Sequence, residues 1–181
     1  MLGYIFAKIK CKLYCVWGKD QDSREKLIMK KFFQSKGMSI GNNCAIYSNI
    51  CSSETWLISI GDNVTISNDV QFITHDNSID RFSEKYCDIF GKIEIGNNCF
   101  IGAHSLILPG VTLGAKTLVA AGSVVTKSFD GGIIAGNPAK KISEIEPFVE
   151  KYSKIAFTGK EYINGKKVAT ENNKNKILQN R

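Results

Sequence analysis

Two consecutive six-residue units stand in the middle of the chain, Ile95-Gly96-Asn97-Asn98-Cys99-Phe100 and Ile101-Gly102-Ala103-His104-Ser105-Leu106. Each unit opens with a branched aliphatic residue that is followed by glycine. The aliphatic position recurs every six residues at Ile107, Leu113, Val119 and Val125, and the fifth position of each unit is small or β-branched. A period of six fits neither the 3.6-residue repeat of an α-helix nor a long two-residue alternation. It is typical of a coil in which each unit supplies one short strand and one turn.

The same pattern appears earlier in the chain, at Ile40-Gly41-Asn42-Asn43-Cys44-Ala45 and at Ile60-Gly61-Asp62-Asn63-Val64-Thr65. In such a coil the aliphatic residue points into a narrow shaft and the small residue fills the space beside it. Cys44 and Cys99 take this small position, so we expect both to be compact core residues. We therefore predict an all-β core, a parallel β-helix of hexapeptide repeats over residues 37–142. A β-sandwich with evenly spaced strands is the alternative, but it does not explain the strict phase.

The six-residue phase is interrupted twice. Ile46 and Ile60 are fourteen residues apart, which indicates a small insertion at residues 52–57. Phe72 and Ile95 are twenty-three residues apart, and residues 76–92 contain no six-residue unit. We predict that this second stretch is a loop protruding from the coil. Long irregular excursions from a rigid scaffold are more often functional than neutral.

Short flanking segments complete the predicted organisation: residues 1–36, an N-terminal helical or capping segment, and residues 143–181, a C-terminal helix and tail. Residues 23–33 predict a helix that Gly37 ends. Residues 143–155 predict a second helix packed back on the coil, and the tail after Val168 is expected to be mobile. For residues 1–17 we favour a cap over the open end of the coil. The alternative is peripheral contact with a membrane surface.

The net charge of +7 is unevenly distributed. Residues 1–36 carry +6, residues 37–142 carry −2 and residues 143–181 carry +3. Because the predicted folded core is slightly acidic, we expect no nucleic-acid partner. Lysines at positions 8, 10 and 12 interrupt the apolar stretch that a secretory signal would need. The six cysteines form no CxxC pair. We expect a cytoplasmic protein, or one at the inner face of the cell membrane if residues 1–17 contact lipid.

These residues resemble the hexapeptide-repeat (left-handed β-helix) acyltransferases, especially the maltose/galactoside-type and surface-polysaccharide O-acetyltransferases. The resemblance covers residues 37–142 and rests on four stretches: Ile95-Gly96-Asn97-Asn98, residues 101–114 with Pro109-Gly110-Val111, Ala121-Gly122-Ser123-Val124-Val125-Thr126-Lys127, and Ala135-Gly136-Asn137-Pro138-Ala139-Lys140. It implies that the coil is left-handed. It also implies an acetyl-CoA-dependent acyl transfer and a homotrimer with active sites between neighbouring subunits.

The chain has only two histidines, His75 and His104. Transfer of an acetyl group to a hydroxyl needs a base, and an imidazole with a pKa near ~6.5 can accept the alcohol proton and return it to the leaving thiolate. In the family, a histidine at the mouth of the long loop has this role, and His75 matches it by position. The alternative is a surface turn histidine bonded to Asp76 or Asn77. The partner of His75 stays open among Asp76, Asn77 and backbone carbonyls.

The resemblance also implies where acetyl-CoA binds. The backbone N–H of Ala103 matches the position that meets the thioester carbonyl, where a donor would stabilise developing negative charge. Small residues leave room for the pantetheine chain, Thr126 and Lys127 fall near the adenine end, and two lysines offer charge to the phosphates. The predicted set is Ala103, Ala121, Gly122, Thr126, Lys127, Lys140 and Lys141. A solvated basic exit from the coil is an equal alternative for Lys140 and Lys141, and His104 is expected to be exposed or at an interface.

The loop supplies the expected acceptor-binding residues, which are Asp76, Asn77, Phe82 and Tyr86. No metal site is predicted. The carbonic-anhydrase-like members of this fold need three histidine ligands, and this chain has two. The leading hypothesis is an O-acetyltransferase acting on a sugar hydroxyl, of a cell-envelope polysaccharide or its precursor, by direct attack in a ternary complex. The alternatives are an N-acetyltransferase of an amino sugar or nucleotide sugar, a serine or xenobiotic acetyltransferase, and an inactive binding or assembly module.

Overall fold

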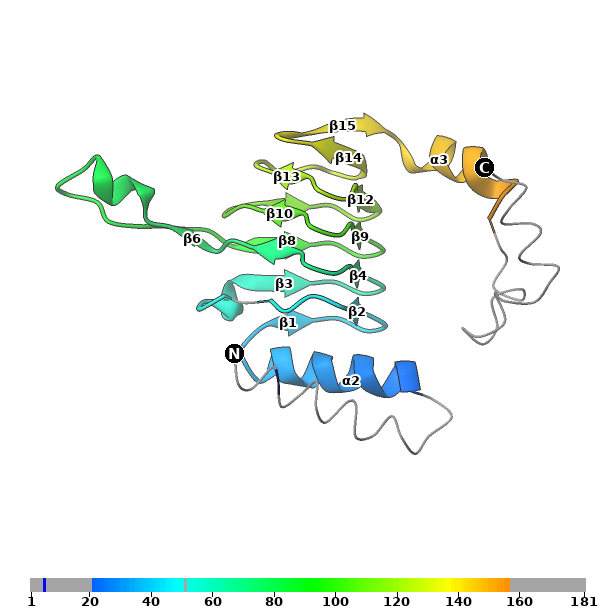
Figure 1. Cartoon of the computed structure of the whole chain (residues 1–181), viewed down its shortest axis with the longest axis horizontal. Helices are drawn as coiled ribbons and strands as arrows, with labels where there is room; N and C mark the ends of the chain where they lie inside the picture. The colour runs from blue at the N-terminus through cyan, green and yellow to red at the C-terminus, as the bar shows by residue number, and fades with distance from the viewer. Residues whose placement is uncertain (1–4, 6–20, 51, 157–181) are drawn as a thin grey trace. The chain divides into compact units, whose positions relative to one another are not determined.

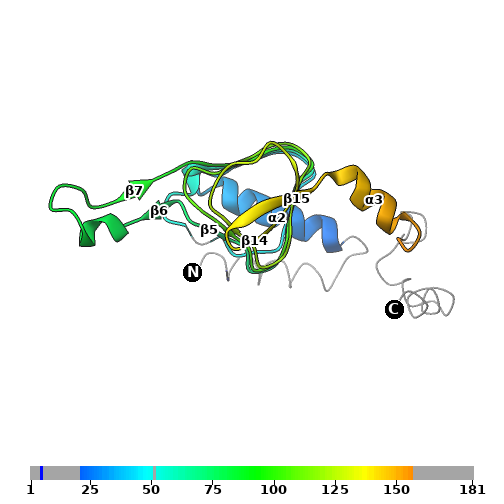
Figure 2. The same cartoon turned by 90° about the horizontal axis from the view of Figure 1, so that it is seen from above.

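The computed structural model describes residue 5, residues 21–50 and residues 52–156. The chain divides into two compact units, Met1–Ser143 and Glu144–Arg181. The first unit is a stack of short parallel strands wound into a three-sided coil (Figures 1 and 2). The parallel β-helix predicted from the six-residue period is therefore confirmed.

Each side of the coil is one sheet, and we number the sides in the order in which the chain visits them. The first side contains β1 (Ser39–Ile40), β3 (Ile58–Ile60), β8 (Ile93–Ile95) and β11 (Thr112–Leu113). The second contains β2 (Ala45–Ile46), β4 (Thr65–Ile66), β9 (Phe100–Ile101), β12 (Thr117–Val119), β14 (Gly132–Gly136) and β15 (Ala139–Ser143). The third contains β5 (Gln71–Phe72), β10 (Leu106–Ile107) and β13 (Val124–Val125). All pairings within these sides are parallel except β14 with β15.

The core consists of three stacks of aliphatic side chains, one behind each side. On the third side Phe72, Ile107 and Val125 pair in register, and all three are at most 3% exposed. Full burial of such a side chain contributes about 1.5–3 kcal/mol, so the repeated aliphatic position supplies most of the driving force for winding. Cys44 and Cys99 lie in this core as predicted, and burial raises the pKa of both thiols.

The turns between sides need left-handed backbone at fixed positions. At the first corner, between the first and second sides, Asn43, Asn63 and Asn98 have φ of 55°, 56° and 58°. Asparagine tolerates this conformation better than most residues. The side chains also form a ladder, since Asn43 Nδ2 donates to Asn63 Oδ1 (2.7 Å) and Asn63 Nδ2 donates to Asn98 Oδ1 (3.3 Å). The left-handed backbone and the asparagine ladder of this corner therefore explain the repeated Gly-Asn-Asn and Gly-Asp-Asn sequences.

The lower end of the coil is covered by helix α2 (Gln21–Gln34), as Figure 1 shows. Met29 and Phe33 are 1% exposed and belong to the hydrophobic core that the first strands share. Lys30 Nζ donates to the carbonyl of Gly41 at 2.5 Å. The helix predicted at residues 23–33 is thus confirmed, and it covers this end of the coil. The cap expected from residues 1–17 stays a prediction. Apart from Ile5, those residues lie outside the described part of the chain.

The second unit contains helix α3 (Ile145–Ser153), which confirms the helix predicted at residues 143–155. Its packing on the coil stays a prediction, and the tail after Val168 lies outside the described residues. Within the described residues, no helix is both long and apolar enough to span a membrane.

Both phase breaks leave the coil at the third corner, between the third and first sides. The shorter one forms a 3₁₀ turn, η1 (Thr55–Leu57). The longer one is an arm (Figures 1 and 2) with a second 3₁₀ turn, η2 (Ser78–Arg81). Its base is an antiparallel ribbon of β6 (His75–Asp76) and β7 (Ile89–Phe90). The protruding loop predicted at residues 76–92 is therefore confirmed, and cross-strand pairing, which the sequence did not predict, joins the two strands at its base.

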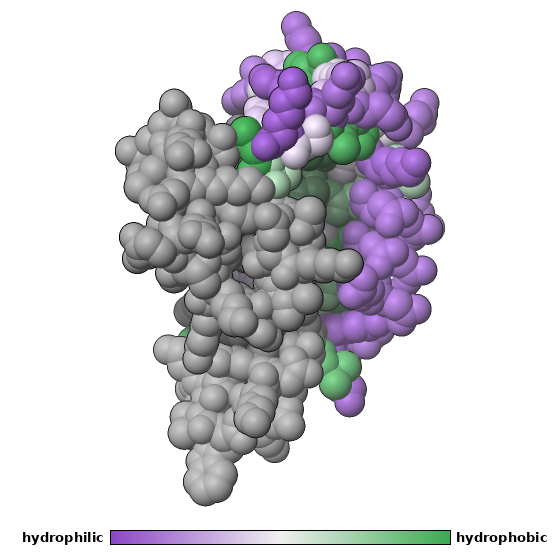
Figure 3. All heavy atoms as spheres, turned by 90° about the vertical axis from the view of Figure 1, so that its right-hand side faces the viewer, coloured by the Kyte–Doolittle hydropathy of each residue, from purple (hydrophilic) through white to green (hydrophobic). Residues whose placement is uncertain are grey.

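The outward side chains differ between the sides. On the first side, Ser39, Ser59, Glu94 and Thr112 pair in register and are all polar. On the second side the outward residues include Phe100, which is 45% exposed, and Leu118 beside it. The described atoms on the face turned to the viewer in Figure 3 are mostly hydrophilic, with smaller hydrophobic patches among them.

Close backbone contact between successive turns makes a sharp stability prediction at Gly102. A Cβ added to this residue would meet Ala121 N at 2.5 Å and Val119 O at 2.7 Å, both of them backbone atoms that cannot move away. We expect Gly102→Ala to destabilise the protein by about 2 kcal/mol or more. Lys116→Gly, which places glycine at a residue with φ of 58°, is the control and should change the melting temperature little. Thermal unfolding followed by circular dichroism measures both, and equal melting temperatures for the two variants would contradict the packing argument.

Candidate active site

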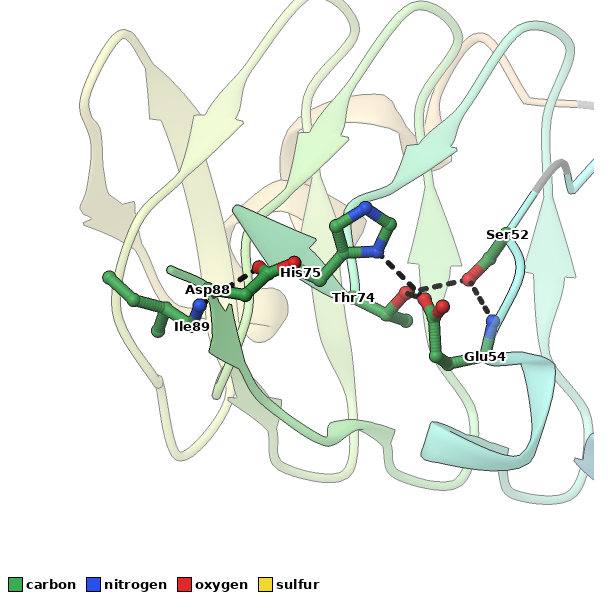
Figure 4. A network of polar contacts seen from close by, with 6 residues as sticks. All are labelled: Ser52, Glu54, Thr74, His75, Asp88 and Ile89. Atoms are coloured by element: carbon green, nitrogen blue, oxygen red, sulfur yellow. Dashed lines mark hydrogen bonds and ion pairs between the residues drawn. The ribbon is translucent and has the colours of Figure 1, made fainter. Parts of the chain in front are cut away.

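The third corner brings together two residues that are far apart in sequence. His75 begins the arm on β6, and Glu54 immediately precedes η1 in the turn below. The Nδ1 atom of His75 lies 2.8 Å from Oε2 of Glu54 (Figure 4). The imidazole side chain is 42% exposed and the carboxylate side chain 13% exposed. The pair therefore has one sheltered partner and one that solvent and ligands can reach.

This contact determines the tautomer of His75. An ionised carboxylate only accepts hydrogen bonds, so Nδ1 must carry the proton that it donates to Glu54. The lone pair of the neutral ring is then on Nε2, which no described residue engages. Phe90, which pairs with His75 across the ribbon, has its ring centroid 5.6 Å from that of the imidazole. The ring is thus held on one edge and beside one face, with its basic nitrogen free.

The charges around the ring shift the titration of both partners. The hydrogen bond that His75 donates to Glu54 raises the pKa of His75 above its usual 6.5. Burial opposes this as the second-largest effect, and the negative charges of Glu54, Asp88 and Asp76 raise the pKa further. The hydrogen bonds from His75 and Thr74 lower the pKa of Glu54. At neutral pH the carboxylate is therefore ionised, and the imidazole is a stronger base than free histidine.

Glu54 was not among the residues predicted from the sequence, and the partners left open there for His75 are not the one found. Asp76 Oδ1 instead accepts a hydrogen bond from the backbone N–H of Ser78 at 2.8 Å, an arrangement that starts η2 and lowers the pKa of Asp76. The available signal was the phase break at residues 52–57. This break lies one coil turn before the break at His75, so the two insertions leave the coil at the same corner in successive turns.

A groove of about 240 Å³ runs along the third side below the arm. Asp69, Gln71 and Ile73 line it from the chain that leads to His75, and Asn49 lines it from the turn below. Two amides and a carboxylate beside apolar residues suit a ligand that carries hydroxyl groups. This groove was not predicted, because it lies between two turns of the coil and has no sequence motif of its own.

The residues predicted to bind the acceptor all lie on the arm. Asp76 and Asn77 are exposed near His75. Phe82 and Tyr86 are 89% and 54% exposed, and Lys85 Nζ lies 5.1 Å from the centroid of the Tyr86 ring. The arm thus presents aromatic surface to solvent, and binding of acceptor there stays a prediction.

The residues predicted to bind acetyl-CoA fall on two different corners. Ala103, Ala121 and Gly122 stand before strands β10 and β13, at the second corner, which lies between the second and third sides. Lys140 lies above them on β15, where it pairs with Ala135, and Lys141 follows it. Thr126 and Lys127 stand after β13, at the third corner with His75. A single chain therefore does not gather this set around its own His75.

The second corner nevertheless fits a thin ligand. A Cβ added to Gly122 would meet nothing within 4 Å, so the backbone there is open to solvent. Within the described residues the N–H of Ala103 has no hydrogen-bond acceptor, whereas the Ala103 carbonyl accepts from Gly122 N at 2.8 Å. His104 projects from the same corner with φ of 59°, and its Nδ1 lies 3.9 Å from Oδ2 of Asp69. A free backbone donor beside small side chains is the surface that a thioester carbonyl requires.

Comparison with known proteins identifies the family to which the chain belongs. Residues 92–127 match the family described as the hexapeptide repeat of succinyl-transferase. Protein CapG of Staphylococcus aureus is 44% identical over 154 residues, which cover 79% of this chain and 90% of that protein. The chain belongs to the hexapeptide-repeat acetyltransferase family. It is accordingly an acetyl-CoA-dependent acetyltransferase of that family, with the left-handed form of the parallel β-helix.

Two further relatives support the assignment. The galactoside O-acetyltransferase of Escherichia coli K12 is 34% identical over 116 residues, which cover 63% of this chain and 57% of that enzyme. A solved structure of a galactoside acetyltransferase in complex with coenzyme A has the same fold. Its TM-score is 0.54 at 24% identity, over 82% of this chain and 83% of that one. The family is thus related to sugar O-acetyltransferases.

Within the described ranges, no three His, Cys, Asp or Glu side chains converge in a way that would hold a metal ion.

The Glu54–His75 contact makes a pH prediction. Only the neutral imidazole can accept a proton, so the rate should rise with pH through the raised pKa of His75, above 6.5. Glu54→Gln removes the negative charge, so the pKa of His75 should fall and the acid limb should move to lower pH. We also expect the plateau rate to fall about tenfold or more, because the tautomer is no longer enforced. Profiles of kcat/KM against pH for both proteins test this, and an unmoved acid limb would contradict it.

Proposed function

We propose that this protein transfers the acetyl group of acetyl-CoA to a hydroxyl group of a sugar, in a cell-envelope polysaccharide or its precursor. The observation that carries the proposal is the 2.8 Å contact between His75 Nδ1 and Glu54 Oε2. It leaves Nε2 unprotonated and exposed, as a general base for an alcohol requires. An amine acceptor has its own lone pair when neutral and gains less from such a base.

Each group of the site has its own role in the proposed acetyl transfer. Acetyl-CoA supplies an acetyl group activated as a thioester. His75 Nε2 accepts the proton of the acceptor hydroxyl as its oxygen attacks, and the imidazolium that forms is stabilised by the carboxylate of Glu54. The same Nε2–H then returns the proton to the departing sulfur. The N–H of Ala103 donates a hydrogen bond to the carbonyl oxygen on which negative charge develops.

The groove along the third side is the proposed acceptor site. It ends at Ile73, two residues before His75, and the side chains of Gln71 and His75 are both exposed on the outside of the coil. Amide and carboxylate groups from Asn49, Gln71 and Asp69 can pair with the remaining hydroxyls of a sugar ring. Asp76, Asn77, Phe82 and Tyr86 would cover the ring from the arm.

The location of the donor site implies a second copy of the chain. Ala103 stands before β10 and His75 after β5, and these strands pair in parallel, so the two residues lie at opposite ends of the third side. At about 3.3 Å per residue, a side of the coil separates them by roughly 15 Å or more. Nε2 therefore serves a thioester held at the second corner of a neighbouring subunit. Repeating this heterologous contact closes a ring of three copies.

The catalytic assignment is tested by release of free thiol from acetyl-CoA. Incubated with a panel of sugars, nucleotide sugars and glycans, the wild-type protein should release thiol with hydroxyl acceptors. His75→Ala should lower the rate by about 10²-fold or more, because general-base catalysis is lost. His104→Ala, which changes the other histidine, is the control and should keep more than about half of the activity on the same scale.

Equal activity of wild type and His75→Ala would contradict the assignment. Activity with amino sugars alone, surviving in His75→Ala, would favour an N-acetyltransferase. If no acceptor of any class led to thiol release, and adding coenzyme A caused no thermal shift, a binding or assembly module would be favoured.

The shared site makes a complementation prediction. His75→Ala removes the base, and Ala121→Trp should block the donor site at the other corner, so each variant alone should be inactive. In a trimer containing both, one of the three sites combines an intact base with an intact donor corner. Heterotrimers isolated through two different tags should therefore have about one third of the wild-type activity. Ala115→Trp, at the first corner, is the matched control and should be active by itself, whereas inactive heterotrimers would indicate a site within one chain.

A further inference from the structure

A closed ring of hydrogen bonds lies behind the Glu54–His75 pair (Figure 4). Thr74 Oγ1 donates to Oε2 of Glu54 at 2.8 Å, and Ser52 Oγ lies 2.6 Å from Thr74 Oγ1. The backbone N–H of Glu54 donates back to Ser52 Oγ at 3.2 Å. The ring therefore joins the first insertion to the residue that directly precedes His75.

The direction of every bond in this ring follows from Glu54. The ionised carboxylate only accepts, so the Thr74 hydroxyl must donate to it. Thr74 has then used its one proton, and its oxygen accepts from the Ser52 hydroxyl. Ser52 in turn accepts from the N–H of Glu54. Each hydroxyl acts once as a donor and once as an acceptor, so no other arrangement of the protons satisfies all the partners.

Thr74 is the rigid member of the ring. It is 2% exposed, its carbonyl accepts from Gly91 N at 3.0 Å, and it is β-branched, which restricts its χ1 angle. A glutamate side chain, by contrast, has several rotatable bonds, and one hydrogen bond to an exposed imidazole would hold it weakly. Oε2 is therefore located by Thr74 on one side while it binds His75 on the other.

We propose that Thr74 and Ser52 are positioning residues for proton transfer at His75, holding Oε2 of Glu54 where it enforces the Nδ1–H tautomer. This rests on the proposed function of His75. Neither hydroxyl touches the acceptor groove or the donor corner, so both act only through Glu54. The role differs from that of an ordinary buried hydroxyl such as Thr117, whose Oγ1 donates to the carbonyl of Gly114 at 2.7 Å within the coil.

The first test measures His75 without turnover. The chain has two histidines, so an NMR titration of the full-length protein resolves two imidazoles, with His104 as the internal reference. Thr74→Val should lower the pKa of His75, in the same direction as Glu54→Gln but by less, because the carboxylate spends less time against Nδ1. Thr74→Ser keeps the hydroxyl and should restore the wild-type titration. Thr117→Val is the matched control and should leave it unchanged. An unshifted His75 in Thr74→Val overturns the proposal, even where the enzyme is fully active.

The second test is a double-mutant cycle on thiol release. We expect Thr74→Val to lower kcat about three- to tenfold with unchanged KM for both substrates, and Ser52→Ala to do the same more weakly. In a Glu54→Gln background, Thr74→Val should cost less than about twofold more, since it has nothing left to position. Additive losses, or a loss that Thr117→Val reproduces at equal melting temperature, would overturn the proposal. A wild-type protein that releases no thiol would contradict the proposed function instead, while the NMR result would still decide the inference.

Discussion

The constant length of one coil turn is the constraint on which the rest of this structure depends. Successive turns approach so closely that a Cβ at Gly102 would meet the backbone of the next turn at 2.5 Å. The buried stacks of Ile66, Ile101 and Val119 keep that spacing uniform along the coil. Extra residues have no place within such a stack and must leave it at a corner. A rigid scaffold of this kind converts a change in sequence spacing into a defined position on its surface.

The candidate active site follows from two such departures at one corner. The insertion at residues 52–57 and the arm after His75 leave the coil one turn apart, so Glu54 and His75 meet without any motif that links them in sequence. The chemistry is asymmetric because the inner insertion is short and sheltered, whereas the arm begins in solvent. The carboxylate accepts a hydrogen bond from the hydroxyl of Thr74, which helps to keep it ionised, and the imidazole presents its basic nitrogen outward.

The sequence predicts the parts of this protein that obey the period. The inward aliphatics, the buried Cys44 and Cys99, the capping helix and the corner at which His75 emerges all follow from counting in sixes or from helical periodicity. Glu54 was missed because the count fails where it lies, and outside the repeat the phase no longer tells which way a side chain points. The ribbon of β6 and β7 was missed because its pairing joins residues thirteen and fifteen positions apart across a stretch without alternation. The groove has contributions from two turns, which no local pattern contains.

The distribution of side chains over the three sides agrees with a site shared between copies. The first side is polar in every outward position of its paired strands, from Ser39 to Thr112, and has no need of a partner. The second side carries exposed Phe100 beside Leu118 on an otherwise flat sheet, apolar area that a second copy would cover. In the proposed mechanism the base stands at one end of the third side and the Ala103 donor at the other, so an isolated chain would hold half of each of two proposed sites. The proposed trimer would complete them by placing the two ends of the third side against different neighbours.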